Sequence, residues 1–205
     1  MSDNLLNNDI VEILENYSSF SEYVFIENLK KRKIIINEEI DDTLVENVIM
    51  QIYKFNEEDE NIPVEKRKPI KIYLNSCGGY IDIGLCLCNV IKQSKTPVYI
   101  YALGRALSMA ALILMAGHKR YAYPFTSILI HDGSTMAADS MSKFLDAADY
   151  YKNITEIIKQ YILENTKITP EFLDKNYRKE MYLTAQEALE LGIIDEILGG
   201  NKSES

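Results

Sequence analysis

The sequence has few cysteines and no long apolar run, and each shortage excludes a class of protein. Of its three cysteines, Cys86 and Cys88 stand two apart on a predicted helix, where they fall on different faces. We expect them to be reduced core residues of a cytosolic protein, with no disulfide and no metal site. The longest apolar stretch, 106–117, has about a dozen residues, too few to span a bilayer core of about 30 Å. We interpret it as a core helix.

Positive charge is also scarce. The chain has 22 lysines and arginines against 31 acidic residues, a net charge of −9 at pH 7. This balance argues against nucleic acid or an anionic membrane as the main partner. Residues 1–4 are polar and acidic, so we expect no secretory leader and a cytoplasmic location. A length of 205 residues suits one domain with a full core and an added arm.

The first part of the chain differs in its pattern from the remainder. Residues 9–17 place apolar side chains on one helical stripe, which predicts a short amphipathic arm that packs on its own core or on a neighbouring subunit. A strand is expected at 33–36 and a solvated loop at 56–68. Between them, 43–55 predicts a helix with four inward side chains: Leu44, Val48, Ile52 and Phe55.

From residue 70 the pattern becomes regular. Strands and helices alternate with short connections, which predicts an α/β fold with a parallel sheet and right-handed crossovers. The expected strands are 70–74, 98–103 and 128–131, and the expected helices are 81–91 and 107–116.

Ser108 occupies the most informative turn. Gly104 is expected to break the strand 98–103, and the buried helix 107–116 comes next. A hydroxyl at this helix N-terminus lies beside free backbone N–H groups that can stabilise an oxyanion. Ser108 is therefore a candidate nucleophile, and the alternative is that it only caps the helix.

Two other strand ends carry suggestive groups, because reactive residues gather at the carboxyl edge of a parallel sheet. One is the turn Asn-Ser-Cys-Gly-Gly at 75–79, and the other is His131. His131 can act as general base to Ser108, although a histidine at a strand end is often only a satisfied polar residue. The one other histidine, His118, lies in the polar turn 116–120 at the far end of the helix that begins at Ser108.

Four ordered blocks resemble the signatures of the Clp protease proteolytic subunit (ClpP) family over about residues 21–198. They are Asn-Ser-Cys-Gly-Gly at 75–79, Gly-Arg-Ala-Leu-Ser-Met-Ala-Ala at 104–111, Ile-Leu-Ile-His at 128–131, and Tyr-Leu-Thr-Ala-Gln-Glu-Ala at 182–188 with Leu-Gly-Ile-Ile-Asp at 191–195. The resemblance implies a crotonase-like (ClpP-type) α/β subunit with a protruding handle helix at 139–165. It also implies two stacked heptameric rings with serine peptidase sites inside. Residues 1–20 would then be an arm and 199–205 a flexible tail.

Carried over block by block, the resemblance makes Ser108 the nucleophile and His131 the base, with the Gly79 and Met109 amides as the oxyanion hole. The position of the family's third member, an aspartate, is occupied by Glu180. Glutamate serves as the acid in some hydrolases of this type, but its extra methylene shifts the carboxylate by more than about 1 Å, which can cost roughly 10²-fold in rate. Asp132 and Asp174 are weaker alternatives.

Other departures concern partners. Cys77 replaces the proline that the family usually has in the glycine turn. An AAA+ unfoldase docks in an apolar cleft in the family; here Tyr73 keeps one aromatic, but Lys71 and Gln93 replace others. A charge in such a cleft is unfavourable unless it reaches water. These changes suggest a specialised member with a different partner or within mixed rings.

The leading hypothesis is a serine endopeptidase that cleaves unfolded polypeptides in a closed chamber and needs no cofactor or metal. The alternative is a catalytically weak structural or regulatory ring subunit. A third hypothesis is an acyl-coenzyme A enzyme of the broader crotonase fold, against which the pairing of Ser108 with His131 speaks.

Overall fold

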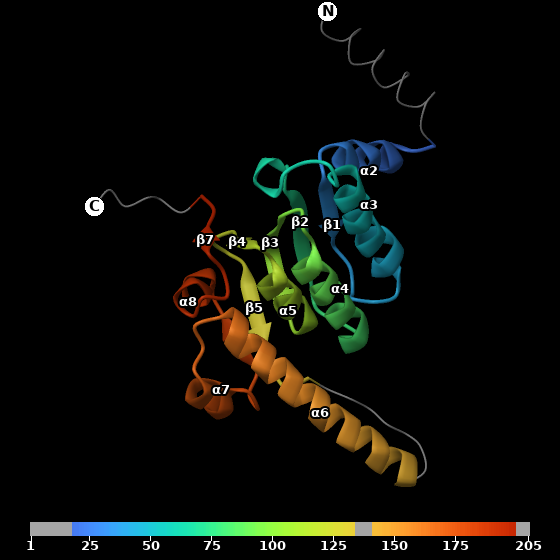
Figure 1. Ribbon diagram of the computed structural model, residues 1–205. Helices are drawn as coiled ribbons and strands as arrows, with labels where there is room; N and C mark the ends of the chain where they lie inside the picture. The colour runs from blue at the N-terminus through green and yellow to red at the C-terminus, as the bar shows by residue number, and fades with distance from the viewer. Residues whose placement is uncertain (1–17, 134–140, 200–205) are drawn as a thin grey trace, which may run out of the picture.

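The computed structural model describes residues 18–133 and 141–199, shown in colour in Figure 1. The predicted arm at 9–17, residues 139–140 of the handle and most of the predicted tail lie outside the described residues. The elements in chain order are α2 Phe20–Lys30, β1 Lys33–Ile36, a π-helical turn Val45–Ile49, α3 Met50–Glu58, a 3₁₀ turn Val64–Lys66, β2 Ile70–Ser76, α4 Ile81–Gln93, β3 Val98–Leu107, α5 Met109–Ala116, β4 Lys119–Ala122, β5 Ser127–Ile130, α6 Met141–Asn165, α7 Pro170–Asn176, β6 Met181–Leu183, α8 Ala185–Glu190 and β7 Glu196–Ile197.

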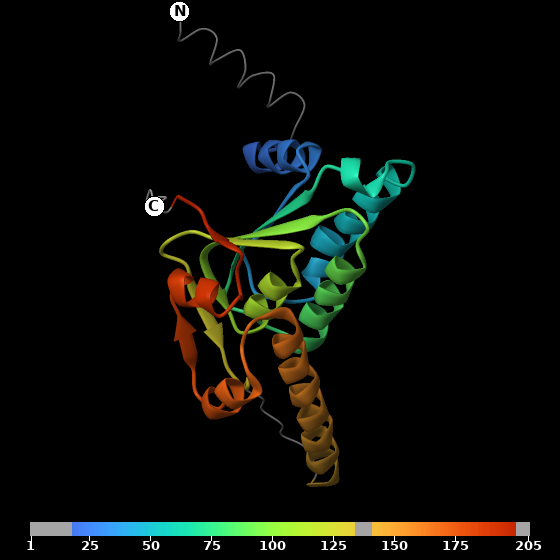
Figure 2. The same ribbon diagram turned by 60° about the vertical axis from the view of Figure 1, so that its left-hand side comes forward.

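A mostly parallel sheet organises the chain. Within the described residues, seven strands form one sheet in which the order β1-β2-β3-β4-β7 is parallel throughout. β5 pairs in parallel with the end of β3, and β6 runs antiparallel to β5. Helices α3, α4 and α5 gather on one side of the sheet (Figures 1 and 2). The α/β fold predicted from the alternation of strands and helices is confirmed.

The two faces of the sheet differ in chemistry because side chains alternate along a strand. Apolar residues such as Ile72 and Ile100 are fully buried on the face toward the helices. The other face carries a row of half-buried tyrosines with ring centroids 5.0 Å and 4.8 Å apart: Tyr73, Tyr101 and Tyr121. The four inward side chains predicted for the helix over 43–55 are all buried, as expected.

The stretch 56–68 is for the most part exposed, as its charge predicts, but it departs from a solvated loop at its beginning. α3 continues to Glu58, and Asp59 is 1% exposed. The carboxylate of Asp59 accepts two hydrogen bonds from the Arg32 guanidinium, at 2.5 and 2.7 Å, and one from the Thr96 hydroxyl at 2.9 Å. The prediction of a solvated loop is wrong for Asp59, because hydrogen bonds stabilise its buried charge in place of water.

Strand β3 is longer than predicted, and this extension places the candidate nucleophile. Gly104 does not end the strand, which runs to Leu107. Gly104 stands where the neighbour of β3 changes from β4, which pairs with residues 99–102, to β5, which pairs with residues 105–107. The predicted polar turn at 116–120 is also shorter, since β4 begins at Lys119. Ser108, the residue after β3, therefore lies directly beside β5.

The three cysteines are free thiols, and only Cys88 lies in the core. Cys86 is exposed on the other face of α4, so the prediction that the two fall on different faces is confirmed, while the prediction that both are core residues is wrong for Cys86. Cys77 is exposed in the glycine turn. In the described part of the chain, no helix is both long enough and apolar enough to cross a membrane.

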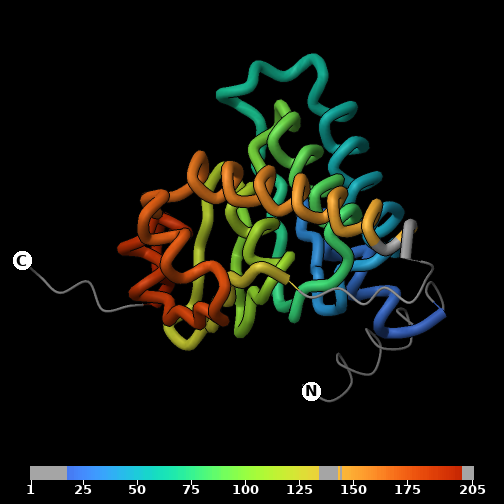
Figure 3. The backbone as a smooth tube through the Cα atoms, turned by 90° about the horizontal axis from the view of Figure 1, so that it is seen from below, coloured from blue at the N-terminus to red at the C-terminus, as the bar shows by residue number. Residues whose placement is uncertain are grey.

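The long helix α6 projects past the sheet, as Figure 1 shows, and Figure 3 shows it from below, crossing the molecule. Its C-terminal half is anchored by buried Ile158 and Ile162. The last carbonyl, of Asn165, accepts a hydrogen bond from the Arg120 guanidinium at 2.7 Å. Leu145, in the N-terminal half of α6, and Ile157, in its C-terminal half, are both exposed. The predicted handle helix is thus present over its described length.

Candidate active site

Ser108 forms a strained elbow between β3 and α5. Its φ of 55° and ψ of −123° lie in a region that non-glycine residues rarely adopt. The Ser108 N–H donates to the Leu129 carbonyl at 2.9 Å, and the Ser108 carbonyl accepts from the Ala111 N–H at 2.9 Å. In the described chain its side chain makes no capping hydrogen bond to α5. The hydroxyl is therefore not used as a helix cap and is available for another contact.

That contact is with His131. The Nε2 atom of His131 lies 2.7 Å from the Ser108 Oγ, within range for proton transfer. His131 directly follows β5, which lies beside the end of β3, so the two strand ends bring the pair together. His118 is placed elsewhere: its Nδ1 accepts from the N–H of Val98, the first residue of β3.

The glycine turn is pressed against the elbow from the other side. Gly78 has a φ of 96°, and a Cβ there would lie 2.7 Å from the Leu107 carbonyl oxygen and 2.8 Å from the Ser108 Cβ. Gly79 has a φ of 153°, and a Cβ there would lie 2.3 Å from the Ile40 carbonyl oxygen. Only glycine fits at either position without moving backbone atoms.

A short bridge to Ile40 orients the second glycine. The Ile40 N–H donates to the Gly78 carbonyl at 2.9 Å, and the Tyr80 N–H donates to the Ile40 carbonyl at 2.8 Å. In a parallel bridge of this kind, the central residue directs its own N–H away from the partner. The Gly79 N–H is thus turned away from Ile40.

Two amides are available to a reacting carbonyl. Met109 is the first residue of α5, so its N–H is one of the helix N-terminal donors without an intrahelical partner. Gly79, Met109, Ser108 and His131 line one pocket of about 400 Å³. The four residues expected to form the nucleophile, base and oxyanion hole are brought together.

Glu180 is placed beside this group but does not complete it. It lies between α7 and β6, with its side chain exposed. The register pairs Ile130 with Met181, so the backbone of Glu180 comes one step beyond that pair, next to His131. Among the described residues, no hydrogen bond joins the Glu180 carboxylate to His131. The backbone position suits a third triad member, and the side chain points to solvent.

The other two carboxylates differ in their surroundings. Asp132 lines the Ser108 pocket and is exposed. Asp174 accepts a hydrogen bond from the Lys159 ammonium at 3.3 Å on the outside of α7, so its carboxylate is engaged away from His131.

One residue of this pocket, Tyr177, was not predicted from the sequence. Tyr177, at the end of α7, is 3% exposed and lines the Ser108 pocket. Burial raises the pKa of Tyr177 to about 12, and the nearby charges of Asp132 and Glu156 add to the effect. The signal available was the spacing of Leu173 and Tyr177, four residues apart, which predicts one buried helix face.

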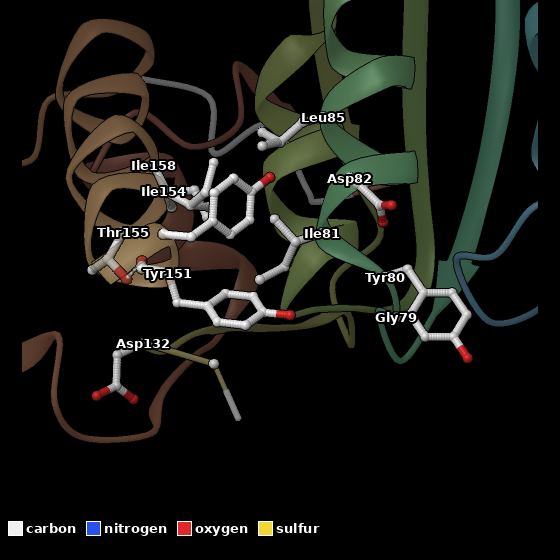
Figure 4. Close-up of a pocket in the computed structure, with 12 residues that line it drawn as sticks. Gly79, Tyr80, Ile81, Asp82, Leu85, Asp132, Tyr151, Ile154, Thr155 and Ile158 are labelled. Atoms are coloured by element: carbon white, nitrogen blue, oxygen red, sulfur yellow. Dashed lines mark hydrogen bonds between the residues drawn. The ribbon is translucent and has the colours of Figure 1, made fainter. Parts of the chain in front are cut away.

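A second pocket of about 380 Å³ continues from the first between α4 and α6. Figure 4 shows Ile81 and Leu85 of α4 facing Ile154 and Ile158 of α6, with Tyr151 below. The two pockets share several residues, including Gly79, Ile81 and Ile158. Together they form a continuous groove that passes Ser108.

The two replacements in the expected docking cleft lie on different surfaces of one subunit. Lys71 is on β2, on the same face of the sheet as Tyr73. Gln93 ends α4 and lines a separate pocket with Tyr53 and Arg67.

A family model described as Clp protease matches residues 18–201, nearly the whole length of the chain.

Proposed function

Because the chain belongs to the Clp protease family, we propose that it is a serine endopeptidase subunit that cleaves unfolded polypeptides into short peptides. The observation that carries the proposal is the 2.7 Å contact between the Ser108 Oγ and the His131 Nε2. It occurs at a strained elbow in a pocket that also contains two candidate oxyanion donors, Gly79 and Met109. This combination is the requirement for acyl transfer through a serine.

The proposed reaction proceeds in two halves. The Ser108 Oγ attacks the peptide carbonyl while His131 accepts the hydroxyl proton, and the Gly79 and Met109 N–H groups stabilise the oxyanion. His131 then donates that proton to the leaving amine, which leaves an acyl group on Ser108. A water molecule, deprotonated by His131, then attacks the acyl carbonyl. The bond to the Ser108 Oγ breaks, His131 returns the proton to that oxygen, and the new carboxylic acid leaves. Glu180 orients the imidazole in this scheme once its carboxylate turns toward His131.

The substrate is proposed to bind as an extended strand along the groove. Gly79 has no side chain to block the approach of a backbone, and recognition through backbone groups gives broad specificity. The apolar walls of the adjoining pocket, such as Ile81 and Ile154, suit side chains of an unfolded chain.

Ring assembly follows from the family in general. We propose two stacked heptameric rings that meet through α6, located in the cytoplasm and fed by an AAA+ ATPase. The exposed apolar residues Leu145 and Ile157 on α6 support the stacking, and the free thiols support a reducing compartment. Lys71 beside Tyr73 argues that the ATPase contact differs from an all-apolar cleft.

A catalytically weak structural or regulatory ring subunit is the second candidate. The observation that favours it is the exposed carboxylate of Glu180, which makes no hydrogen bond to His131 among the described residues. An imidazole without an orienting acid is a much weaker base in triads of this kind.

A fluorophosphonate probe distinguishes the two candidates. The assembled full chain, Ser108→Ala and a control, Ser127→Ala at the exposed start of β5, would be treated and their intact masses measured. The peptidase predicts one adduct per subunit in the wild type and in Ser127→Ala, and none in Ser108→Ala. No adduct on folded, assembled wild type would support the structural subunit.

A further inference from the structure

The Ser108 pocket has an apolar interior that the reaction scheme does not use. Leu112 of α5, Ile158 and Ile162 of α6, and Tyr177 all line it, and each is less than 9% exposed. Since the oxyanion donors and Ser108 fix where the reacting carbonyl sits, this interior is next to the side chain of the residue that supplies that carbonyl. Its dimensions therefore bear on which peptide bonds react.

Tyr177 is the largest of these side chains and is held on several sides. Its N–H donates to the Leu173 carbonyl at 2.7 Å. The Lys159 ammonium lies 5.4 Å from the centre of its ring. Lys159 is itself paired with Asp174 at 3.3 Å and with Glu156 at 3.5 Å. The ring is thus fixed between α6 and α7, and a substrate cannot easily displace it.

The Tyr177 hydroxyl is also uncharged at neutral pH. Its raised pKa keeps the hydroxyl protonated throughout the neutral range. Tyr177 therefore contributes a rigid, uncharged ring to the apolar interior, whose other three side chains are aliphatic; the pocket's acidic residues, Glu39 and Asp132, are exposed. Such a wall discriminates by size rather than by charge.

We propose that Tyr177 sets the size limit of the subsite for the side chain whose carbonyl Ser108 attacks, so that short aliphatic residues are accepted and aromatic residues are excluded. This inference rests on the proposed peptidase function. It names the substrate class of that site: peptide bonds that follow alanine, valine or leucine. Tyr177 is a specificity-determining residue in this account and takes no part in bond making.

The test uses three fluorogenic peptides that differ only in the residue before the cleaved bond, which is Ala, Leu or Phe. The assembled wild type is expected to cleave after Ala and Leu and only weakly after Phe. In Tyr177→Leu and Tyr177→Ala, the ratio of kcat/KM for Phe to that for Ala should rise by about tenfold or more, as expected for a pocket enlarged by several methylene equivalents. Tyr177→Phe keeps the ring and should keep the wild-type ratio.

Phe172→Leu is the matched control, because this residue lies on the same helix, is 37% exposed and does not line the pocket. Its ratio of kcat/KM for the Phe peptide to that for the Ala peptide should equal the ratio of the wild type. Fluorophosphonate labelling of each variant reports an intact Ser108 site separately from specificity.

The outcomes separate the two proposals. An unlabelled wild type refutes the peptidase function itself. A labelled wild type that prefers Phe over Ala and Leu overturns the role of Tyr177 without any variant, even if Tyr177→Ala and Tyr177→Leu fail to fold. Labelled variants with an unchanged ratio overturn it as well.

Discussion

Ile130 and Met181 are paired across β5 and β6, and this pairing brings the backbones of His131 and Glu180 side by side. Residues opposite each other in an antiparallel ladder have Cβ atoms about 5 Å apart, so a glutamate side chain can reach an imidazole there by a change of rotamer. A change of rotamer would thus bring the longer Glu180 side chain to His131 without a shift of the strand.

Glu180→Gln tests this relationship. Loss of the charge should lower the second-order rate constant of fluorophosphonate labelling at Ser108 by roughly 10²-fold to 10⁴-fold, because the imidazolium loses its counter-charge and its orientation. Glu180→Asp should retain more activity than Glu180→Gln. Glu171→Gln, an exposed position on α7, is the matched control and should label as the wild type does.

Equal labelling of Glu180→Gln and the wild type would contradict the assignment. Asp132, which lines the Ser108 pocket, would then be the next carboxylate to test. The measurement is the rate of adduct formation by intact mass over time, at a fixed concentration of assembled protein.

The sequence was sufficient for the parts of the site that lie at strand ends. A parallel sheet collects the residues after its strands at one edge, so Ser108, His131 and the glycine turn could be placed together from periodicity alone. The same reasoning predicted most of β1, β2, β3 and β5 and the helices between them, because each carries a clear alternating or helical apolar pattern.

What the sequence did not reveal depends on contacts between distant segments. The bridge from Ile40 to Gly79 joins a loop to the glycine turn and has no local signature. In the sequence Asp59 resembles any charged loop residue, because its partner Arg32 is far away in the chain and only the fold brings the two together. Tyr177 could be recognised as buried from its spacing, but the pocket that it lines is formed by α5 and α6.

Gly78→Ala should abolish fluorophosphonate labelling while the protein still folds. The added Cβ would lie 2.8 Å from the Ser108 Cβ, and shifting the elbow by even about 1 Å disrupts the contact with His131. Gly199→Ala is the control: its φ of 72° is also positive, but among the described residues outside its immediate chain neighbours no atom lies within 4 Å of the added Cβ. Labelling that survives Gly78→Ala would show that the elbow tolerates a shift of the glycine turn.

The ion pair of Asp59 and Arg32 should stabilise the fold in a pH-dependent way. The hydrogen bonds from Arg32, which outweigh the opposing effect of burial, hold the pKa of Asp59 below its ordinary value, and Thr96 adds to them. A lowered pKa in the folded state gives stabilisation that is complete above the unfolded value of about 3.9 and is lost as the pH falls through the folded value.

Asp59→Asn should therefore reduce the free energy of unfolding by about 2 kcal/mol at pH 7, since it removes the charged partner of two Arg32 hydrogen bonds and leaves the half-buried guanidinium with only the exposed Glu58, 3.5 Å away. The difference from the wild type should shrink as the pH falls below about 4. Urea unfolding at pH 7, 5, 3 and 2 measures this difference in the free energy of unfolding, with the exposed Asp42→Asn as control. An equal loss at every pH would show that the carboxylate acts through packing and not through its charge.

The backbone strain at Ser108 predicts an unusual order of thermal stability for two variants at this position. Relief of an unfavourable φ and ψ is worth about 1–3 kcal/mol, whereas the extra chain entropy of glycine in the unfolded state costs about 0.4–1 kcal/mol. Relief is the larger effect, so Ser108→Gly should unfold at a higher temperature than Ser108→Ala, although both lack the nucleophile. At Ser127, in the regular strand β5, the order should reverse, and the glycine variant should unfold at a lower temperature than the alanine variant. Thermal unfolding of the four variants at one protein concentration checks both orders, and the same order at both positions would show that Ser108 stores no strain.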